Sequence, residues 1–154
     1  VIITSQMEHA SVRSESVQLA PMVCVMQKGH PLAKHKSVSA KDIGNTPFVG
    51  FGSTSRTRRT VEAAFKEESQ SLNIVIEAST SQNVAEFVAQ GFGITVARAA
   101  FFESVKARVE IRPFLPTQME TLNVLRPVRA RNTVLLDSFV NAVRFAAEEA
   151  VWST

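Results

Sequence analysis

Apolar residues occur in short runs along the chain, separated by polar segments that contain glycine, proline or charged residues. Most runs are only a few residues long and are apolar at consecutive positions, as in a sheet that helices cover on both faces. We expect such strands at residues 1–4, 22–26, 48–51, 74–78, 94–96, 109–112 and 122–125. Helix-like segments alternate with these runs, and that alternation predicts an α/β fold.

Three segments have the periodicity or the end signals of a helix. The first is GSTSRTRRTVEAAFKEE, residues 52–68, where Ser53 or Thr54 can cap the start. The second is SQNVAEFVAQG, residues 81–91, for which Gly91 predicts the C-terminal end. The third covers residues 134–151, and we expect its inward face to contain Leu136, Phe139, Val140 and Val143.

Length and composition are those of a soluble globular domain. The chain has 154 residues, of which 45% are hydrophobic and 20% charged, and no apolar run approaches the roughly 20 residues of a membrane-spanning helix. The formal net charge of +3 is only mildly basic. The first residue is Val1 without a secretory signal, so we expect an N-terminal part to be missing. The one cysteine, Cys24, lies in the apolar run MVCVM and is expected to be a buried structural thiol in a reducing compartment.

A lysine-rich segment, QKGHPLAKHKSVSAKDIGNTPFV at residues 27–49, lies between two apolar runs. It contains four lysines, two histidines and two prolines, and we interpret it as an exposed connector. His30 and His35 as metal ligands are the alternative, but no carboxylate or thiolate pair is near them in the sequence. We therefore expect neither a metal ion nor another cofactor.

Candidate ligand-binding residues follow the strands, because α/β sheets bind ligands beyond the carboxyl ends of their strands. Thr4, Ser5 and Gln6 come after the first strand and present short polar side chains, with a solvated loop as the alternative. Ser81 and Gln82 belong to the turn before the second helix, where Ser81 is also a candidate N-cap.

The segment GSTSRTRR at residues 52–59 combines hydroxyl side chains with arginines at a helix start. The helix dipole favours an acidic residue there, so Arg56 conflicts with its position unless an anion lies between its guanidinium and the free N–H groups. We expect Ser53, Thr54 and Arg56 to contact a carboxylate ligand. Arg58 and Arg59 are interpreted as a solvated basic face.

The pattern contains no signature of an enzyme. The GFG of residues 91–93 closes a helix and leads into a strand, the reverse of the order that a phosphate-binding loop requires. No nucleophile elbow is present, and no histidine and carboxylate stand at a readable spacing. We therefore expect a binding domain and not an enzyme.

Several of these segments resemble LysR-type transcriptional regulators in order and spacing. The matching segments are LAPMVCVMQKGHPLAKHKSVSAKDIGNTPFVGF, IEASTSQNVAEFVAQGFGITV and VEIRPFLP, with an arginine in a helix after a Ser/Thr-rich turn. The resemblance covers nearly the whole chain. It implies the effector-binding domain, two α/β subdomains of the periplasmic-binding-protein type II architecture with part of the first subdomain missing. It places residues 1–20 and 122–154 in subdomain I and residues 21–121 in subdomain II.

The same resemblance implies which residues bind a ligand. A small molecule would bind between the subdomains, with Ser53 and Thr54 in a turn that commonly contributes to effector binding. After the strand ITV the chain has Ala97 and Arg98, where the family often has a Leu-Pro pair. Arg98 is therefore either a second ligand contact or an ordinary surface charge.

We interpret the chain as the effector-sensing domain of a cytoplasmic bacterial regulator, non-catalytic, which binds a small carboxylate or amino-acid-like effector. DNA would be bound only through a helix-turn-helix domain that this chain lacks, no membrane would be involved, and the assembly would be a homodimer or homotetramer. The alternative is the solute-binding protein of a transporter, which shares the two-lobed fold but requires export.

Overall fold

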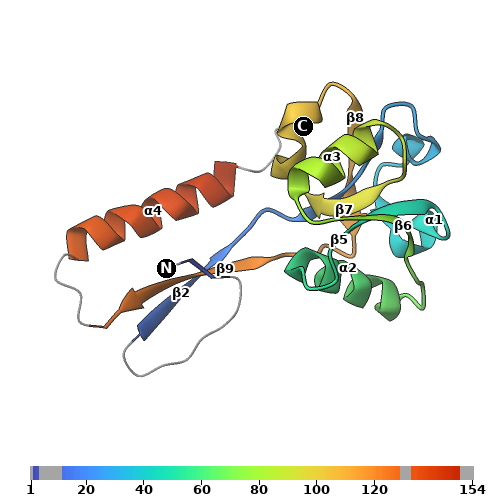
Figure 1. Ribbon diagram of the computed structural model, residues 1–154. Coiled ribbons are helices and arrows are strands. Elements are labelled where there is room, and N and C mark those ends of the chain that lie inside the picture. Colours follow the sequence, from blue (N-terminus) through green and yellow to red (C-terminus); the bar gives the residue numbers. More distant parts are fainter. Residues whose placement is uncertain (1, 4–11, 129–132, 150–154) are drawn as a thin grey trace. The chain divides into compact units, whose positions relative to one another are not determined.

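The computed structural model describes residues 2–3, 12–128 and 133–149 of the chain. Its strands and helices form two compact units (Figure 1), one from Val1–Ala20 with Met119–Thr154 and one from Pro21–Gln118. We call them unit 1 and unit 2. Strands and helices are mixed in both, so the expected α/β fold class is confirmed. That the two units are effector-binding subdomains with the expected boundaries stays a prediction.

Unit 1 contains a three-stranded antiparallel sheet and one helix. Strand β9 (Thr121–Pro127) lies between β1 (Ile2–Ile3) and β2 (Val12–Gln18), and helix α4 (Thr133–Glu149) packs on this sheet. The buried residues that form its small core are Val17, Leu19, Val124 and Val140. Strand β2 is not among the predicted strands, because its sequence VRSESVQ is mostly polar.

An ion-pair network holds α4 to the sheet of unit 1. Arg126 of β9 binds Glu15 of β2 (Nη2 to Oε1, 2.6 Å) and Asp137 of α4 (Nη1 to Oδ1, 2.8 Å). Arg144 of α4 approaches the second oxygen of Glu15 at 3.5 Å. One guanidinium therefore links three elements of the unit, and a second reinforces the contact.

The inward face expected for α4 is only partly correct. Val140 is buried and Val143 packs against it partly buried, whereas Phe139 is 46% exposed. Leu135 and Phe145 are exposed as well. Apolar residues thus occupy more than one face of the helix, and periodicity alone could not select the buried one.

Unit 2 is built on a mixed sheet of two parts, one with four strands and one with two, and every strand except the short one at residues 38–39 follows a predicted apolar run. Strands β5 (Pro47–Phe51) and β6 (Asn73–Ala78) are parallel neighbours. In the other part, β3 (Met22–Gln27) lies between β7 (Thr95–Arg98) and β8 (Val109–Leu115) and is antiparallel to both. The short β4 (Val38–Ser39) pairs in parallel with β8 at the edge.

Ile94 joins the two parts of this sheet. Its N–H donates to the Pro47 carbonyl (2.9 Å), and its own carbonyl accepts from the Val49 N–H (2.8 Å). This approach requires glycine at position 93, because a Cβ there would lie 2.5 Å from the Pro47 carbonyl oxygen. Gly91, with a φ of +84°, follows the end of helix α3 (Ser81–Ala89), as expected. The GFG motif is therefore a helix stop and a sheet junction.

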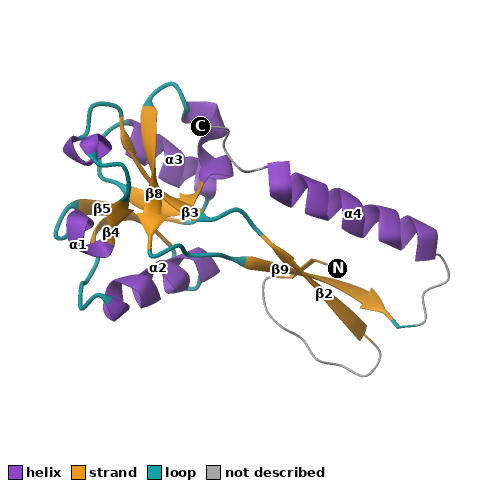
Figure 2. Cartoon of the chain, turned by 180° about the vertical axis from the view of Figure 1, so that it is seen from behind, coloured by secondary structure: helices purple, strands orange, loops and turns teal. Residues whose placement is uncertain are grey.

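Two helices of unit 2, α2 (Arg56–Glu67) and α3, are seen beside its strands in Figure 2. They pack against the sheet through separate clusters of apolar side chains. Helix α2 contributes Phe65 to the cluster that contains Cys24, and α3 contributes Val88 to the cluster that contains Val25. Cys24 and Val25 are neighbours in β3 and point to opposite faces, so both faces of the strand are covered. Cys24 is fully buried, as expected, and this burial raises the pKa of its thiol to about 12.

The interpretation of the lysine-rich segment as an exposed connector is wrong in part. Between β3 and β5 the chain forms the 3₁₀ helix η1 (Pro31–Lys34), strand β4 and the short helix α1 (Ala40–Ile43). These elements bury Leu32, Val38, Ala40 and Ile43. Ser39 and Asp42 form a capping box at the start of α1. The segment therefore contributes to the core while its lysines remain exposed.

We predict that Thr95→Val stabilises the chain. Thr95 is fully buried in β7, and within the described residues its hydroxyl has no hydrogen-bond partner. A hydroxyl that is buried without a hydrogen bond loses its contacts with water on folding and gains nothing in return. Its removal should therefore raise the free energy of unfolding by about 1 kcal/mol. Urea denaturation measures this as a higher midpoint at an unchanged slope. A lower midpoint would mean that the hydroxyl is satisfied in solution, for instance by a buried water.

Candidate functional site

The parallel strands of unit 2 bring three polar segments to one edge of the sheet. Phe51 and Ala78 are paired at the carboxyl ends of β5 and β6, and the Gly52 N–H donates to the Ala78 carbonyl (3.2 Å). Strand β7 is parallel to β5 through the bridge at Ile94, so it ends at the same edge, at Arg98. The predicted residues of unit 2 therefore gather where the strands end, as the sheet geometry implies.

The turn between β5 and α2 lacks the side-chain cap that we expected from Ser53 or Thr54. Both are exposed, and the N-cap position belongs to Ser55, whose side chain makes no capping hydrogen bond. The Ser55 N–H instead donates to the Gly52 carbonyl (2.8 Å), which closes a tight turn. In the described part of the chain the start of α2 therefore lacks the usual side-chain cap from its N-cap residue.

Arg56 is the first residue of α2 and is half-buried. Among the described residues it has neither an ion-pair partner nor a hydrogen-bond partner for its guanidinium. The first turn of α2 contains no acidic residue either. The conflict between this cation and the positive end of the helix is therefore not resolved within the described part of the chain.

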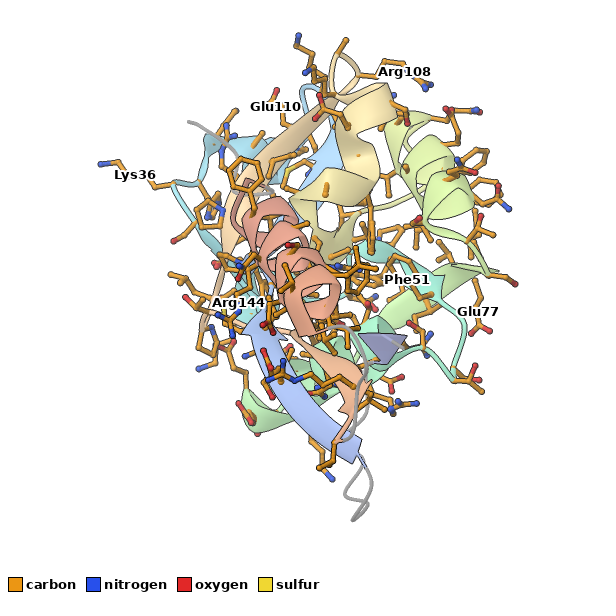
Figure 3. All side chains as sticks on the ribbon, turned by 90° about the vertical axis from the view of Figure 1, so that its left-hand side faces the viewer. Lys36, Phe51, Glu77, Arg108, Glu110 and Arg144 are labelled. Carbon is orange, nitrogen blue, oxygen red and sulfur yellow. The ribbon has the colours of Figure 1, made fainter. Side chains whose placement is uncertain are left out.

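Arg58 does not belong to a solvated face, and that expectation is wrong. Its side chain is only 12% exposed, and its Nε donates to Glu62 Oε1 (2.6 Å) one helical turn later. Its Nη1 donates to the Phe51 carbonyl (3.1 Å) and lies 3.4 Å from Glu77 Oε2 at the end of β6 (Figure 3 labels Phe51 and Glu77). Arg58 thus ties the start of α2 to the ends of two strands.

The backbone beside Arg58 is adapted to the guanidinium. A Cβ at Gly50 would lie 2.9 Å from Nη1 of Arg58, so the strand has no side chain where the arginine crosses it. Arg59 is exposed, as expected, but it also donates from Nη1 to the Thr54 carbonyl (2.7 Å). Both arginines therefore help to fix the turn that presents Arg56.

The second predicted segment precedes α3. Its N-cap is Thr80, whose hydroxyl accepts from the Asn83 N–H (3.2 Å), so the expected cap at Ser81 is wrong by one residue. Ser81 is half-buried and Gln82 exposed at the start of the helix. Both residues lie at the strand-end edge, and no hydrogen bond links their side chains to the α2 turn in the described part of the chain.

Arg98 is the last residue of β7 and the N-cap of the 3₁₀ helix η2 (Ala99–Val105). Its guanidinium lies over the ring of Phe101, 4.3 Å from the centroid. The Phe101 ring in turn contacts Phe51, with centroids 5.9 Å apart. These two aromatic residues were missed in the sequence, although each lies at a strand end or just beyond it. They connect the β5 and β7 segments of the edge.

Two further sets of candidates have different outcomes. Thr4, Ser5 and Gln6 lie outside the described residues. His30 accepts the Leu32 N–H on Nδ1 (3.2 Å), and partial burial lowers its pKa, while His35 lies 4.0 Å from Asp42. In the described ranges no three His, Cys, Asp or Glu side chains are arranged to hold a metal ion.

None of the described helices has the length and hydropathy of a membrane-spanning helix.

Relatives of this chain include proteins of known role. It is 33% identical over 76 residues to the HTH-type transcriptional activator CmpR of a Synechocystis species, covering 49% of this chain and 25% of that protein. It is 23% identical over 134 residues to the transcriptional activator LysR of Escherichia coli, covering 85% of this chain and 43% of that protein. The chain thus spans less than half the length of either relative.

Solved structures share the fold. The regulatory domain of Synechocystis CcmR in complex with 2-PG matches with a TM-score of 0.74 at 16% identity, over 95% of this chain and 72% of that one. The effector-binding domain of QuiR in complex with shikimate matches with a TM-score of 0.71 at 17% identity, over 96% and 71%. The model of the LysR substrate binding domain matches residues 1–147. The chain therefore belongs to the LysR substrate binding domain family.

Proposed function

We propose that the chain is the effector-sensing part of a transcriptional regulator and that its effector is a small carboxylate. The observation that supports a carboxylate is Arg56, which has no partner for its guanidinium among the described residues and begins α2, where Ser55 makes no side-chain cap. The guanidinium and the positive end of the helix dipole both favour an anion at the same place. The CcmR and QuiR domains were solved with 2-PG and shikimate, so ligands of this size suit the fold.

The remaining residues of the edge give the proposed site its selectivity. Ser53 and Thr54 offer hydroxyl groups from an exposed turn that Arg59 holds in place. Ser81 and Gln82 offer polar groups from the α3 turn. Arg98, stacked on Phe101, presents a second cation next to an aromatic surface. Such a mixture suits a ligand with an anionic group and a small polar or apolar body.

We propose a non-catalytic mechanism in which the effector binds one conformation of the domain more tightly than another and shifts the population toward it. The coupling reaches DNA through a segment of the regulator outside these residues, and the regulator acts as a homodimer or homotetramer in the cytoplasm. The curated relatives are transcriptional activators, which favours this role over that of a transporter's solute-binding protein.

A thermal-shift screen tests the proposed function. We expect at least one acid, from a panel of amino-acid-derived and aromatic carboxylates, to raise the melting temperature of the regulator. At a free ligand concentration of about 100 times Kd, a ligand that binds only the folded state raises the free energy of unfolding by about 2.7 kcal/mol. The corresponding amides, which lack the negative charge, should have no effect. A panel in which the amides stabilise as well as the acids would contradict an anion site.

Arg56→Ala should weaken binding of a carboxylate found in that screen by about one to two orders of magnitude. A charge-assisted contact in a partly desolvated site contributes about 1.5–3 kcal/mol. Thr54→Ala should weaken binding of the carboxylate only a few-fold, by roughly 1 kcal/mol, because a neutral hydrogen bond is lost. Isothermal titration calorimetry measures both, beside a melting curve for each variant.

Lys66→Ala is the matched control for Arg56→Ala, since Lys66 is an exposed cation in the last turn of the same helix. It should bind the acid like the parent. If Lys66→Ala and Arg56→Ala reduce the affinity equally, the effect is one of net charge and the anion is not at the helix start.

Arg58→Ala should lower the free energy of unfolding by about 1–2 kcal/mol. It removes a charged hydrogen bond to the Phe51 carbonyl and two ion pairs, but Glu62 and Glu77 are about half exposed and regain water. Lys66→Ala should change stability by less than about 0.5 kcal/mol. Urea denaturation at neutral pH compares the two variants. Equal midpoints would show that the Arg58 network contributes nothing to folding.

A further inference from the structure

The lysine-rich segment is not part of the proposed effector site. Residues 28–42 contain one acidic residue, Asp42, and four basic ones, which are Lys28, Lys34, Lys36 and Lys41. Their three net positive charges equal the whole excess of 17 basic over 14 acidic residues in the chain. All other residues together are balanced. Residues 56–59 and 126–131 each carry three positive charges without an acidic residue as well, so lysine content and not net charge alone sets residues 28–42 apart. We call this segment the lysine surface.

The lysine surface is anchored to the core of unit 2. Leu32, Val38 and Ile43 are buried beneath it. Arg112 of β8 donates from Nε to the carbonyls of Ala33 (2.9 Å) and His35 (3.0 Å) and so holds the backbone between η1 and β4. The four lysines thus project from a fixed frame, and ordering of the backbone would cost little on binding.

The ammonium groups of the lysine surface are not neutralised by the protein. All four lysines are exposed, and none has an ion-pair or hydrogen-bond partner for its ammonium among the described residues. Figure 3 shows Lys36 extended away from the ribbon. Three carboxylates contact this segment without pairing with a lysine ammonium. Asp42 accepts from the N–H and hydroxyl of Ser39, Glu110 accepts from the Gly29 N–H and pairs with Arg112, and Glu68 accepts from the Lys41 N–H.

The chemistry of this surface suits phosphate groups better than a protein partner. Its large apolar residues are buried, and none of the exposed large hydrophobic side chains of the described residues lies within residues 28–42. Protein interfaces need an apolar core and are depleted in lysine. The backbone of duplex DNA, by contrast, is a regular array of negative charges that lysines bind without reading sequence.

We propose that the lysine surface docks on the sugar-phosphate backbone of double-stranded DNA. The proposal rests on the proposed function, under which the chain is part of a regulator that acts on DNA. The contact is sequence-independent and adds to whatever specific recognition the regulator has. It requires no effector, and it weakens steeply with salt because bound counterions are released from the DNA.

Fluorescence anisotropy of a labelled duplex of arbitrary sequence, titrated with this 154-residue chain, tests the proposal. At about 50 mM salt we expect a dissociation constant on the order of 10⁻⁴–10⁻⁶ M, as for other non-specific binding. Lys34→Gln combined with Lys36→Gln should reduce the affinity by about an order of magnitude. The slope of log K against log salt should fall in magnitude by about 2, one for each lost phosphate contact.

The matched control removes two positive charges elsewhere, by Lys106→Gln combined with Arg144→Gln. Lys106 is already paired with Glu103, and Arg144 with Glu15, and both basic side chains are more than half exposed. This variant should bind the duplex like the parent, and circular dichroism should show that both variants are folded. An equal loss in the two variants would overturn the proposal, because only net charge would matter.

Poly-glutamate in place of the duplex distinguishes the other class of partner. If it binds more tightly than DNA at the same salt and the lysine variant loses that binding, the surface recognises an acidic protein and the DNA proposal fails. The assay contains no small carboxylate, so its outcome is independent of the effector screen. Failure here would leave the effector site standing, and failure of the screen would leave this surface standing.

Discussion

The junction at Ile94 is the constraint on which the architecture of unit 2 depends. Two backbone hydrogen bonds, to Pro47 and from Val49, hold the β5–β6 pair in parallel register with β7. Without them the sheet would be two separate pieces, and nothing would require β5, β6 and β7 to end at one edge. The approach is so close that only a residue without a side chain fits at position 93. A glycine that looks like part of a phosphate-binding motif therefore serves the geometry of the sheet.

Sequence reasoning located strands such as β3 and β5 because they are buried at most positions and nearly all of their residues are apolar. It missed strands that are defined by hydrogen-bonded pairing with a neighbouring strand and not by an apolar composition. β2 is largely polar and is held by its register with β9, and β4 is a two-residue strand inside a lysine-rich segment. The N-cap of α3 shows another limit, since Thr80 and Ser81 have the same capping chemistry and only the backbone conformation selects between them.

The arginines of α2 show why the site was only partly predictable. Arg56 and Arg58 are two residues apart, so they point to nearly opposite sides of the helix. The side of the helix that carries Arg58 contacts the Phe51 carbonyl and Glu77. Glu77 lies in β6, 19 residues further along the chain, so local sequence could not reveal this contact. The side of Arg56 meets no such partner in the described structure. The helix-dipole argument applies equally to both arginines, and only their different tertiary contacts distinguish a structural role from a binding role.

The exposed lysines between residues 28 and 42 have a consequence for association kinetics. Ammonium groups that no carboxylate pairs with, among the described residues, act on a polyanion before contact, so they favour encounters in which this segment faces it. The gain is in the rate of productive encounter, and it is lost when added salt shortens the Debye length and screens these charges.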